Sequence, residues 1–499
     1  MRSEGPVRFW TSFDCAIVCI ACGIAFTAAA YAEAGTVPDR PNIILMMADD
    51  LGYGDLGCFG HPVIATPNID ALAAQGTRYT TFYAGHPTCS PSRAAMMTGR
   101  TPFRSGIYNY IPGDSCVHLR HDEVTLAELC ESAGYRTAFF GKWGLIGDMD
   151  DASQASPGDQ GFDHWFATHN NADPSHADPT NFYENGEPLG ELTGFSSQIV
   201  VDRAVKWLDA NAGGDEPFFL VLWFHEPHLE LAQPEEYTRR YAAYAPQESL
   251  YYGNVEHLDH QVGRLLEYID EAGIDDAWVT FTSDNGGKQQ AGARNGGLRG
   301  GKASFYDGGL RVPTVMRWPG VIEAGAVVGT PLTFFDFFPT YCDLLGSERP
   351  ADRDFDGCSL LPILTGGRVE RSALPLWIGR HHAVVREGEW KLLARFERFR
   401  PGQTLTEYFK TRRPASFELY NLKDDPKERH DLSDRSPDKL RSLSQVLQSR
   451  LTGVQAEIVT WGGRNVVPEK AARNLGGRFP AGSWKTLSAE RQEYLGHER

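Results

Sequence analysis

The chain has 499 residues, of which 41% are hydrophobic and 23% charged, and its formal net charge is -17. This composition excludes a largely disordered protein and allows one large domain with a smaller partner. The acidic balance argues against a nucleic-acid partner, because nucleic-acid binders neutralise phosphates with a basic face. An anionic substrate would have to be held by local cations.

Residues 1–32 are predicted to form a secretory signal peptide. Basic residues precede an apolar run at 15–30, and a small-x-small cleavage site ends at Ala32. One alternative is a retained membrane anchor, although the run is shorter than the roughly 20 residues that a spanning helix needs. The other is lipidation at Cys22. The mature protein is therefore expected to be secreted or periplasmic, without stable membrane insertion after cleavage.

Four apolar runs predict strands that are buried on both faces, at residues 42–48, 135–140, 218–224 and 278–282. Helices are predicted between them, at residues 68–76 with Asn68 as the cap, 125–133, 197–210 and 249–272. Residues 150–195 lack periodicity and are expected to form a long surface insertion. Strands that alternate with helices predict a mostly parallel sheet, covered by helices on both faces.

Polar side chains follow the predicted strands at the point where each strand ends. They are Asp49, Asp50, Lys142, His225, His228, Asp284 and Asn285. Ligands of such sheets collect outside the carboxyl ends of the strands, so these residues are expected to converge. Taken singly, each has a structural alternative, such as a solvated turn or a hydrogen-bonded core histidine. The acids and the amide are hard oxygen donors, which favour Ca²⁺ or Mg²⁺ over zinc.

A cysteine is predicted at the start of a short helix. Pro91 suits a first helical position, and Gly99 can end the helix. Cys89 would then lie in the field of a helix N-terminus, with Arg93 close by, where an anionic substrate can dock. The alternative is the commonest role of a cysteine, that of a small buried hydrophobic residue.

The pattern Cys-x-Pro-Ser-Arg followed by Thr-Gly-Arg, from Cys89 to Arg100, resembles the signature of the type I sulfatases. The resemblance covers most of residues 40–345. It implies an α/β fold, an alkaline-phosphatase-like sandwich with a large mostly parallel central sheet, plus a smaller C-terminal α+β domain with an antiparallel sheet. In that family the cysteine is oxidised to formylglycine, whose hydrate is the nucleophile.

The resemblance implies cofactors and roles for the polar residues. The cofactors are Ca²⁺, with Mg²⁺ as the alternative, and a formylglycine that a formylglycine-generating or anaerobic sulfatase-maturating enzyme makes from Cys89. The implied metal ligands are Asp49, Asp50, Cys89, Asp284 and Asn285. The implied catalytic residues are Cys89, Arg93, Lys142, His228 and Lys302. The substrate-binding candidates are Lys142, His228, Lys302, Asn171 and His225.

One position departs from that family pattern, and one further basic residue lies in the segment that carries Lys302. Gly144 stands where many members carry a histidine that acts on the formylglycine hydrate, and His86, His169 and His225 are the candidates to replace it. Arg311, in the glycine-rich segment that also carries Lys302, is a further candidate to bring positive charge to the cleft.

The predicted domains are a catalytic domain at 37–345, a smaller domain at 346–461 and a polar extension at 462–499. In the smaller domain, strands are expected at 383–386, 389–395 and 417–420, and a helix at 437–452. Its loop at 395–413 holds six basic side chains against two acidic ones, with aromatic residues between them. The loop is either simply solvated or a subsite for an acidic polymer. One disulfide, between Cys342 and Cys358, is also conceivable.

The function expected from the sequence is that of an exported sulfatase. Residues 161–166 resemble glycan-directed members, including enzymes that act on N-acetylgalactosamine 6-sulfate, so a sulfated polysaccharide is the expected substrate. The alternatives are a phosphodiesterase or phosphonate monoester hydrolase on the same scaffold, and a catalytically impaired relative that binds glycans.

Overall fold

The structure is a computed structural model that describes residues 37–461 apart from residues 39, 372 and 401–402. The predicted signal peptide at 1–32 and the predicted extension at 462–499 lie outside the described residues. Within the described part, no helix has both the length and the apolar character that crossing a bilayer requires.

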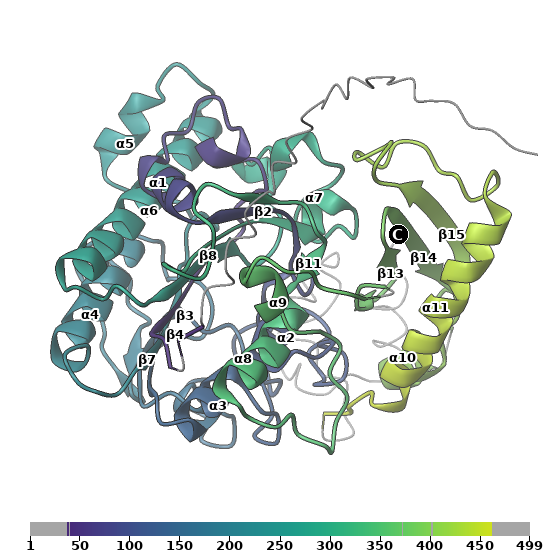
Figure 1. The fold of residues 1–499 in the computed structure, drawn as a ribbon, viewed down its shortest axis with the longest axis horizontal. Helices are drawn as coiled ribbons and strands as arrows, with labels where there is room; N and C mark the ends of the chain where they lie inside the picture. Colours follow the sequence, from purple (N-terminus) through teal and green to yellow (C-terminus); the bar gives the residue numbers. More distant parts are fainter. Residues whose placement is uncertain (1–36, 39, 372, 401–402, 462–499) are drawn as a thin grey trace, which may run out of the picture.

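An eleven-stranded sheet runs through the larger part of the molecule (Figure 1). Its strands are β1 (Ile43–Ala48), β2 (Thr77–Tyr83), β3 (Arg136–Lys142), β4 (His164–Thr168), β5 (Tyr183–Glu184), β6 (Glu187–Pro188), β7 (Phe218–Trp223), β8 (Trp278–Ser283), β9 (Arg311–Arg317), β10 (Val327–Val328) and β11 (Leu332–Thr333). Their order is β10-β2-β9-β8-β1-β7-β3-β4-β5-β6, with β11 beside β2. From β8 to β4 all neighbours are parallel, whereas β9 is antiparallel to both β8 and β2. The prediction of a mostly parallel sheet is confirmed.

Helices cover both faces of this sheet, because alternate side chains of its strands point to opposite sides. Ile43, Leu45 and Met47 of β1 pack with α2 (Cys89–Thr98), α3 (Leu126–Ser132) and α8 (Phe337–Leu345). Ile44 and Met46 pack on the other side with α1 (Pro67–Gln75), α4 (Ser196–Asn211) and α6 (Pro246–Glu271). The shorter helices are α5 (Glu235–Arg240), α7 (Asp307–Leu310), α9 (Leu361–Leu364), η1 (Gly57–Phe59), η2 (Gly158–Gln160), η3 (Gln289–Ala291), η4 (Asn295–Gly297) and η5 (Phe334–Asp336).

The predicted cap of the first helix is wrong. Pro67 occupies the first helical position of α1, and Thr66 precedes it. Asn68 therefore lies inside the helix, where its side-chain amide donates to Asp259 Oδ2 on α6 at 2.7 Å. Asn68 therefore joins α1 to α6 and does not cap α1.

The expectation that residues 150–195 form a long surface insertion is wrong in part. Within it, β4 pairs in parallel with β3 and extends the sheet by one strand. Phe166 at its centre is fully buried and stacks on Phe182 with ring centroids 4.6 Å apart. A strand of five residues is too short to show a period, and its packing against β3 determines its conformation.

A four-stranded antiparallel sheet forms the smaller part of the molecule. It consists of β12 (Trp377–Ile378), β13 (His382–Glu387), β14 (Trp390–Phe396) and β15 (Pro414–Asn421). On one face α10 (Leu405–Thr411) and α11 (Pro437–Ala456) bury their apolar side chains against it. On the other face it packs against residues that neighbour β2 and α7. The expected antiparallel sheet is confirmed, and α11 extends four residues beyond its predicted end.

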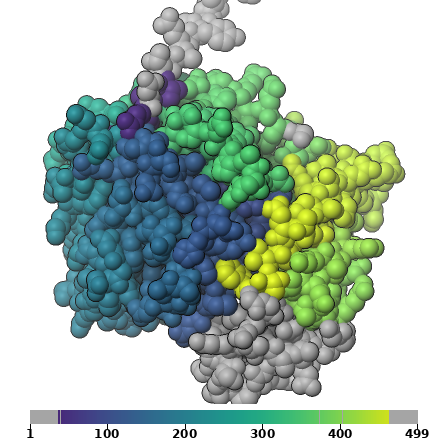
Figure 2. All heavy atoms as spheres, turned by 90° about the horizontal axis from the view of Figure 1, so that it is seen from below, coloured from purple at the N-terminus to yellow at the C-terminus, as the bar shows by residue number. Residues whose placement is uncertain are grey.

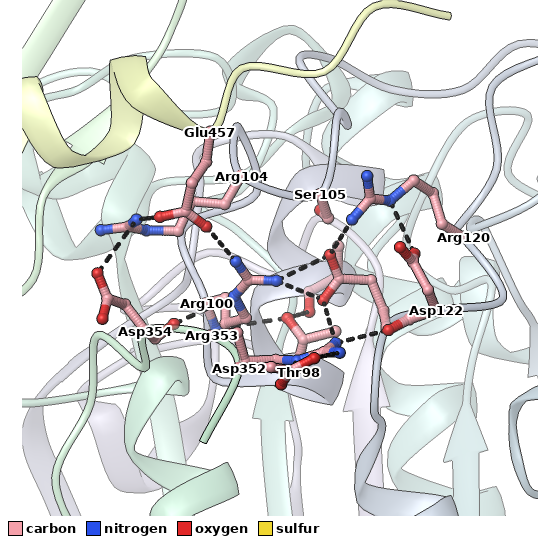
Figure 3. Close-up of polar contacts among 12 residues, drawn as sticks. Thr98, Arg100, Arg104, Ser105, Arg120, Asp122, Asp352, Arg353, Asp354 and Glu457 are labelled. Atoms are coloured by element: carbon pink, nitrogen blue, oxygen red, sulfur yellow. Dashed lines mark hydrogen bonds and ion pairs between the residues drawn. The ribbon is translucent and has the colours of Figure 1, made fainter. Parts of the chain in front are cut away.

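The two parts are joined by a buried network of charged side chains. Arg100, just after α2, makes two hydrogen bonds to the buried Glu123, at 2.8 and 2.9 Å. Arg100 and Arg104 also pair with Glu457, the residue that follows α11 (Figure 3). Figure 2 shows the yellow C-terminal segment packed directly against the blue segment that carries these arginines. The smaller sheet is thereby held in place beside the helix that begins at Cys89.

No disulfide joins Cys342 to Cys358, because the structure holds both as free thiols. Cys342 lies on the buried side of α8, in the core beneath the large sheet. Cys358 belongs to a different environment, where its backbone N–H donates to Asp336 Oδ1. The conceived pairing is therefore wrong.

Candidate functional site

Cys89 is the first residue of α2, as predicted, and Gly99 ends the helix with a left-handed φ of 65°. The helix lies beneath the carboxyl edge of the large sheet, and Cys89 is 4% exposed. Its Sγ lies 3.6 Å from Asp49 Oδ1. A core cysteine would be surrounded by hydrocarbon alone, so its position beside a carboxylate favours the functional interpretation over the structural one.

The acidic side chains at the ends of β1 and β8 converge, as the strand order requires. Asn285 Nδ2 donates to Asp50 Oδ1 at 2.7 Å, and the backbone N–H of Asp50 donates to Asp284 Oδ1 at 3.1 Å. Asp50 adopts a left-handed φ of 67°, which is uncommon outside glycine and turns the chain back toward β8. Residues more than 230 positions apart thus share one cluster.

Basic side chains surround the acidic cluster. Lys142 Nζ lies 2.5 Å from Asp49 Oδ2, and Lys302 Nζ lies 2.7 Å from Asp50 Oδ2. Arg93 contacts Asp284 Oδ2 through both Nε and Nη2, at 3.1 and 2.9 Å. These three cations come from β3, from the loop before α7 and from α2, and the tertiary fold brings them together.

Two further predicted residues lie within this cluster. His228 Nε2 is 3.6 Å from Asp50 Oδ2, and the ligand atoms of Asp49, Asp50, Cys89 and His228 all lie within 4.8 Å of one another. Asn171, in the loop after β4, accepts a hydrogen bond from Lys142 Nζ at 3.0 Å.

Burial and charge decide the ionisation of these groups. Burial opposes the charge of Asp49, but the positive charges of Lys142, Arg93 and Lys302 outweigh it and hold the pKa of Asp49 well below its usual value. Burial raises the pKa of the Cys89 thiol to about 12. An unmodified Cys89 would therefore carry no thiolate at neutral pH and would be a poor nucleophile.

The donor set fits an oxygen-ligated divalent cation. Three carboxylates and one amide meet at the site, and Asn285 Oδ1 is buried without a hydrogen-bond donor among the described residues. Burial, together with the negative charge of Asp49, raises the pKa of Asp284 to about 7. A cation at this point would relieve that repulsion and give Asn285 Oδ1 a partner.

Two further candidates form hydrogen bonds outside the acidic cluster. His225 is fully buried, and its Nε2 lies 2.8 Å from Thr168 Oγ1 at the end of β4. Arg311 donates from Nε to the backbone oxygen of Thr80 at 2.7 Å and reaches the hydroxyl group of Tyr53. Neither contact joins the acidic cluster, so the suggestion that Arg311 brings charge to the cleft is wrong.

Gly144 lies directly against the site. It has a left-handed φ of 70°, and a Cβ atom added there would lie 3.1 Å from Arg93 Cδ. A histidine at this position would strain the backbone and press on Arg93. Of the histidines named to replace it, His86 bonds Thr88 Oγ1 at 2.8 Å, and His169 accepts the Gly144 N–H through its backbone oxygen. Among the described histidines, His228 is the one whose ring is grouped with the Cys89 sulfur.

Two residues of the smaller part support the loop that carries Lys302, and sequence reasoning missed both. Lys391 of β14 is 1% exposed and pairs with Asp307 and Glu428, each at 2.8 Å. Glu428 Oε2 also accepts the Asp307 N–H at 2.6 Å. A lysine and a glutamate in an antiparallel domain are normally surface residues, so no periodicity reveals this role.

The strand order and the cluster of acidic and basic side chains at the carboxyl ends of the strands define an α/β protein with a charged candidate site. The chain belongs to the sulfatase family: the family model described as Sulfatase matches residues 41–347, and the model described as N-sulphoglucosamine sulphohydrolase, C-terminal, matches residues 301–457. It is accordingly a sulfuric ester hydrolase.

Individual relatives agree with this assignment. The chain is 32% identical to N-acetylgalactosamine-6-sulfatase of Canis lupus familiaris, over 85% of this chain and 87% of the relative. It is 31% identical to arylsulfatase D of Homo sapiens, over 79% and 83%. The solved structure of Ps i-CgsB in complex with k-i-k-neocarrahexaose is 28% identical, with a TM-score of 0.73 over 84% of this chain and 94% of that one. The expected alkaline-phosphatase-like fold is confirmed.

Proposed function

We propose that this sulfatase removes sulfate from a sulfated polysaccharide outside the cytoplasm, using a formylglycine formed from Cys89 and a bound divalent cation, Ca²⁺ in preference to Mg²⁺. The observation that carries the proposal is that Cys89 lies beside Asp49 and Asp50. Lys142 and Arg93 pair with Asp49, and Lys302 pairs with Asp50. The Cys89 thiol is buried and protonated, so it is a poor nucleophile. Conversion to an aldehyde hydrate would give position 89 a nucleophilic oxygen instead.

The protein's own side chains would hold the sulfate and move its protons. Lys142 and Lys302 place two ammonium groups at the cluster, where they neutralise the equatorial oxygens of the ester. Arg93 donates hydrogen bonds to Asp284 and to the backbone oxygen of Lys142. These bonds fix α2 and would thereby orient the residue at position 89. His228 and Lys302 both lie at Asp50 Oδ2 and are the candidates to deliver a proton to the leaving oxygen. Burial lowers the pKa of His228 to about 4, so Lys302 is the protonated one of the two at neutral pH.

The absent groups supply the remaining chemistry. When bound, a divalent cation held by Asp49, Asp50, Asp284 and Asn285 supplies positive charge that stabilises the transition state of ester cleavage. A formylglycine hydrate formed at position 89 would supply the nucleophilic oxygen.

Carbohydrate specificity is supported by the relatives' names and by the loops at the cleft. The canine relative is an N-acetylgalactosamine-6-sulfatase, and the Ps i-CgsB structure holds a carbohydrate, k-i-k-neocarrahexaose. In this chain Asn171 contacts Lys142 from the loop after β4, and this contact supports a role for Asn171 in binding the sugar that carries the sulfate. Export follows from the signal peptide predicted at 1–32.

The reaction is tested with 4-nitrocatechol sulfate and a phosphodiester analogue, assayed side by side on protein from a host that makes formylglycine. We expect sulfate-ester hydrolysis to dominate and chelation of divalent cations to abolish it, with recovery on adding Ca²⁺. The phosphonate monoester hydrolase of Agrobacterium radiobacter shares this fold, with a TM-score of 0.61 and 22% identity. A clear preference for the phosphodiester would overturn the proposal.

The nucleophile is tested separately by mass spectrometry of the peptide that contains residue 89. We expect the mass change that corresponds to replacement of the sulfur and two hydrogens by one oxygen. An unmodified cysteine in protein from the native host, together with absent turnover, would favour a glycan-binding relative without catalysis.

A further inference from the structure

A basic pocket lies in the smaller part of the molecule, within the segment that the sequence shows as a basic loop. Its volume is about 300 Å³, and its walls come from the start of the 397–413 segment and from the end of α10. Four arginines line it, Arg398, Arg400, Arg412 and Arg413, against one acid, Glu397. The acid is already paired with Arg400 at 3.0 Å. A net positive pocket on a chain with a net charge of -17 is suited to an anion.

The segment is not the solvated loop that one interpretation of the sequence expects. Phe399, Tyr408 and Phe409 are buried, and α10 forms one side of the pocket. The hydroxyl group of Tyr408 donates to the backbone oxygens of Glu397 and Arg380. The pocket is therefore built on a packed core.

Arg412 forms the buried wall of the pocket and has no counter-ion. It is 2% exposed, and its Nη1 donates to the backbone oxygens of Gly379 and Arg380 at 2.7 and 2.5 Å. Its Nε and Nη2 lack any acceptor among the described residues, and no carboxylate of that part of the chain pairs with it. Burial lowers the pKa of Arg412 to about 9. Aromatic rings enclose it, the nearest being Phe396 at 4.1 Å.

An uncompensated charge inside hydrocarbon acts over a longer distance than one in water. The positive field of Arg412 therefore reaches the pocket and adds to that of the exposed arginines at its rim, Arg398 and Arg413. Guanidinium groups bind planar or tetrahedral oxyanions through paired N–H donors, which ammonium groups do not. All four cations of the pocket are arginines, and this favours a sulfate or carboxylate group as the ligand.

Contacts link the buried arginine of the pocket to the loop that carries Lys302. Arg412 is bonded to Gly379, and Gly379 lies so close to Phe305 that an added Cβ atom would meet its ring at 2.4 Å. Phe305 belongs to the loop that carries Lys302, and its ring lies 5.4 Å from that of His86, three residues before Cys89. These contacts connect Arg412 with the loop that carries Lys302 and with the segment that leads to Cys89.

We propose that this arginine pocket is a second anion subsite, which binds a sulfate or carboxylate group on another sugar of the same acidic chain whose sulfate ester enters at Cys89. The inference rests on the proposed function and adds that the enzyme recognises an oligosaccharide with at least two anionic groups. A monosulfated small ester fills the cleft alone.

The test compares an Arg398→Ala/Arg413→Ala double variant with Lys410→Ala. Lys410 is exposed on α10 but does not line the pocket, so it controls for the loss of one positive charge nearby. The probes are 4-nitrocatechol sulfate, inorganic sulfate and hexasaccharides of chondroitin 6-sulfate and of carrageenan, with binding measured by calorimetry and turnover by sulfate release. Because both substituted side chains are exposed, the variants are expected to fold.

For a hexasaccharide that the enzyme binds, we expect the double variant to raise KM relative to KM for 4-nitrocatechol sulfate by about five- to tenfold, the loss of two charge contacts. In Lys410→Ala, the ratio of KM for the hexasaccharide to KM for 4-nitrocatechol sulfate should stay within about twofold of the wild-type ratio. An unchanged ratio in the double variant overturns the subsite, and so does failure of wild-type protein to bind any hexasaccharide while it cleaves the small ester.

Inhibition by inorganic sulfate shows whether the ligand of the pocket is a free anion or an anionic group on a carbohydrate chain. If the double variant alters only inhibition by inorganic sulfate, the pocket binds a free anion and the inference is wrong. If wild-type protein hydrolyses neither class of sulfate ester, the proposed function fails, and the calorimetric comparison of the same variants still decides whether the pocket binds an acidic oligosaccharide.

Discussion

At the scale of single residues, the chemistry depends on a cysteine that is buried among charges. The carboxylate of Asp49 lies beside Cys89, while Lys142 and Lys302 are the nearest cations that lower the thiol pKa. Burial outweighs them and keeps the thiol protonated. Under the proposed function, these charged side chains would surround an oxygen nucleophile formed from Cys89.

Replacing Cys89 by alanine tests this residue. We expect turnover of 4-nitrocatechol sulfate to fall by about 10⁴-fold or more, as when a nucleophile is removed, and the free energy of unfolding to change by about 1 kcal/mol or less. Cys130→Ala is the matched control, because Cys130 is a buried thiol in the core next to α8 and should keep its activity. Global unfolding of Cys89→Ala in a denaturant titration would instead identify a structural cysteine.

At the scale of elements, the loop after β8 positions Lys302 through contacts between backbones. Gly286 follows the acidic pair Asp284 and Asn285, and its N–H donates to the backbone oxygen of Gly309 at 2.9 Å. A Cβ atom on Gly286 would lie 1.8 Å from the backbone oxygen of Gly308. The strand end and the start of α7 approach each other only because no side chain separates them.

Substituting Gly286 by alanine should therefore impair catalysis more than folding. We expect kcat/KM to fall by at least about tenfold as Asn285 and Lys302 shift, with a loss of about 1–3 kcal/mol in the free energy of unfolding. Gly213→Ala is the control, since a Cβ atom there meets nothing within 4 Å and should change stability by less than about 0.5 kcal/mol. Wild-type kcat/KM in Gly286→Ala would show that the contact does not position the loop.

At the scale of the whole molecule, the smaller sheet supports the cleft through a buried ion network. Lys391 balances Asp307 and Glu428, and Asp307 Oδ2 accepts a hydrogen bond from the hydroxyl group of Tyr83 at 2.9 Å. Burial opposes the charge on Lys391, yet the two carboxylates raise its pKa above the usual value. The ammonium group of Lys391 thus compensates the negative charges of two carboxylates that are buried between the two sheets.

Replacing Lys391 by methionine keeps the volume and removes the charge. Two carboxylates would then face each other in the interior, and we expect the free energy of unfolding to fall by about 3–5 kcal/mol. Lys423→Met removes an exposed pairing with Glu389 at 3.3 Å and should cost about 1 kcal/mol or less. Equal stability of the two variants in thermal and denaturant unfolding would contradict the proposed role of the buried network.

The sequence predicts the large sheet well, because its strands are apolar runs that end abruptly at polar residues. It also predicts convergence at Asp49, Asp50, Asp284 and Asn285, since the carboxyl ends of parallel strands meet at one edge. It places Cys89 at a helix start through Pro91 and Gly99, and the structure agrees. The predicted metal-binding role of the acidic cluster, the predicted catalytic role of Cys89 and the domain boundary near residue 345 remain predictions.

Only the tertiary structure decides the rest. It adds β4 to the sheet, joins His225 to Thr168 at the end of that strand and turns the basic loop into a packed pocket around Arg412. These outcomes depend on contacts between residues far apart in the chain, which local periodicity does not record. A run of apolar side chains determines its own strand, whereas the burial of a charged group such as Arg412 or Lys391 depends on what the folded chain places around it.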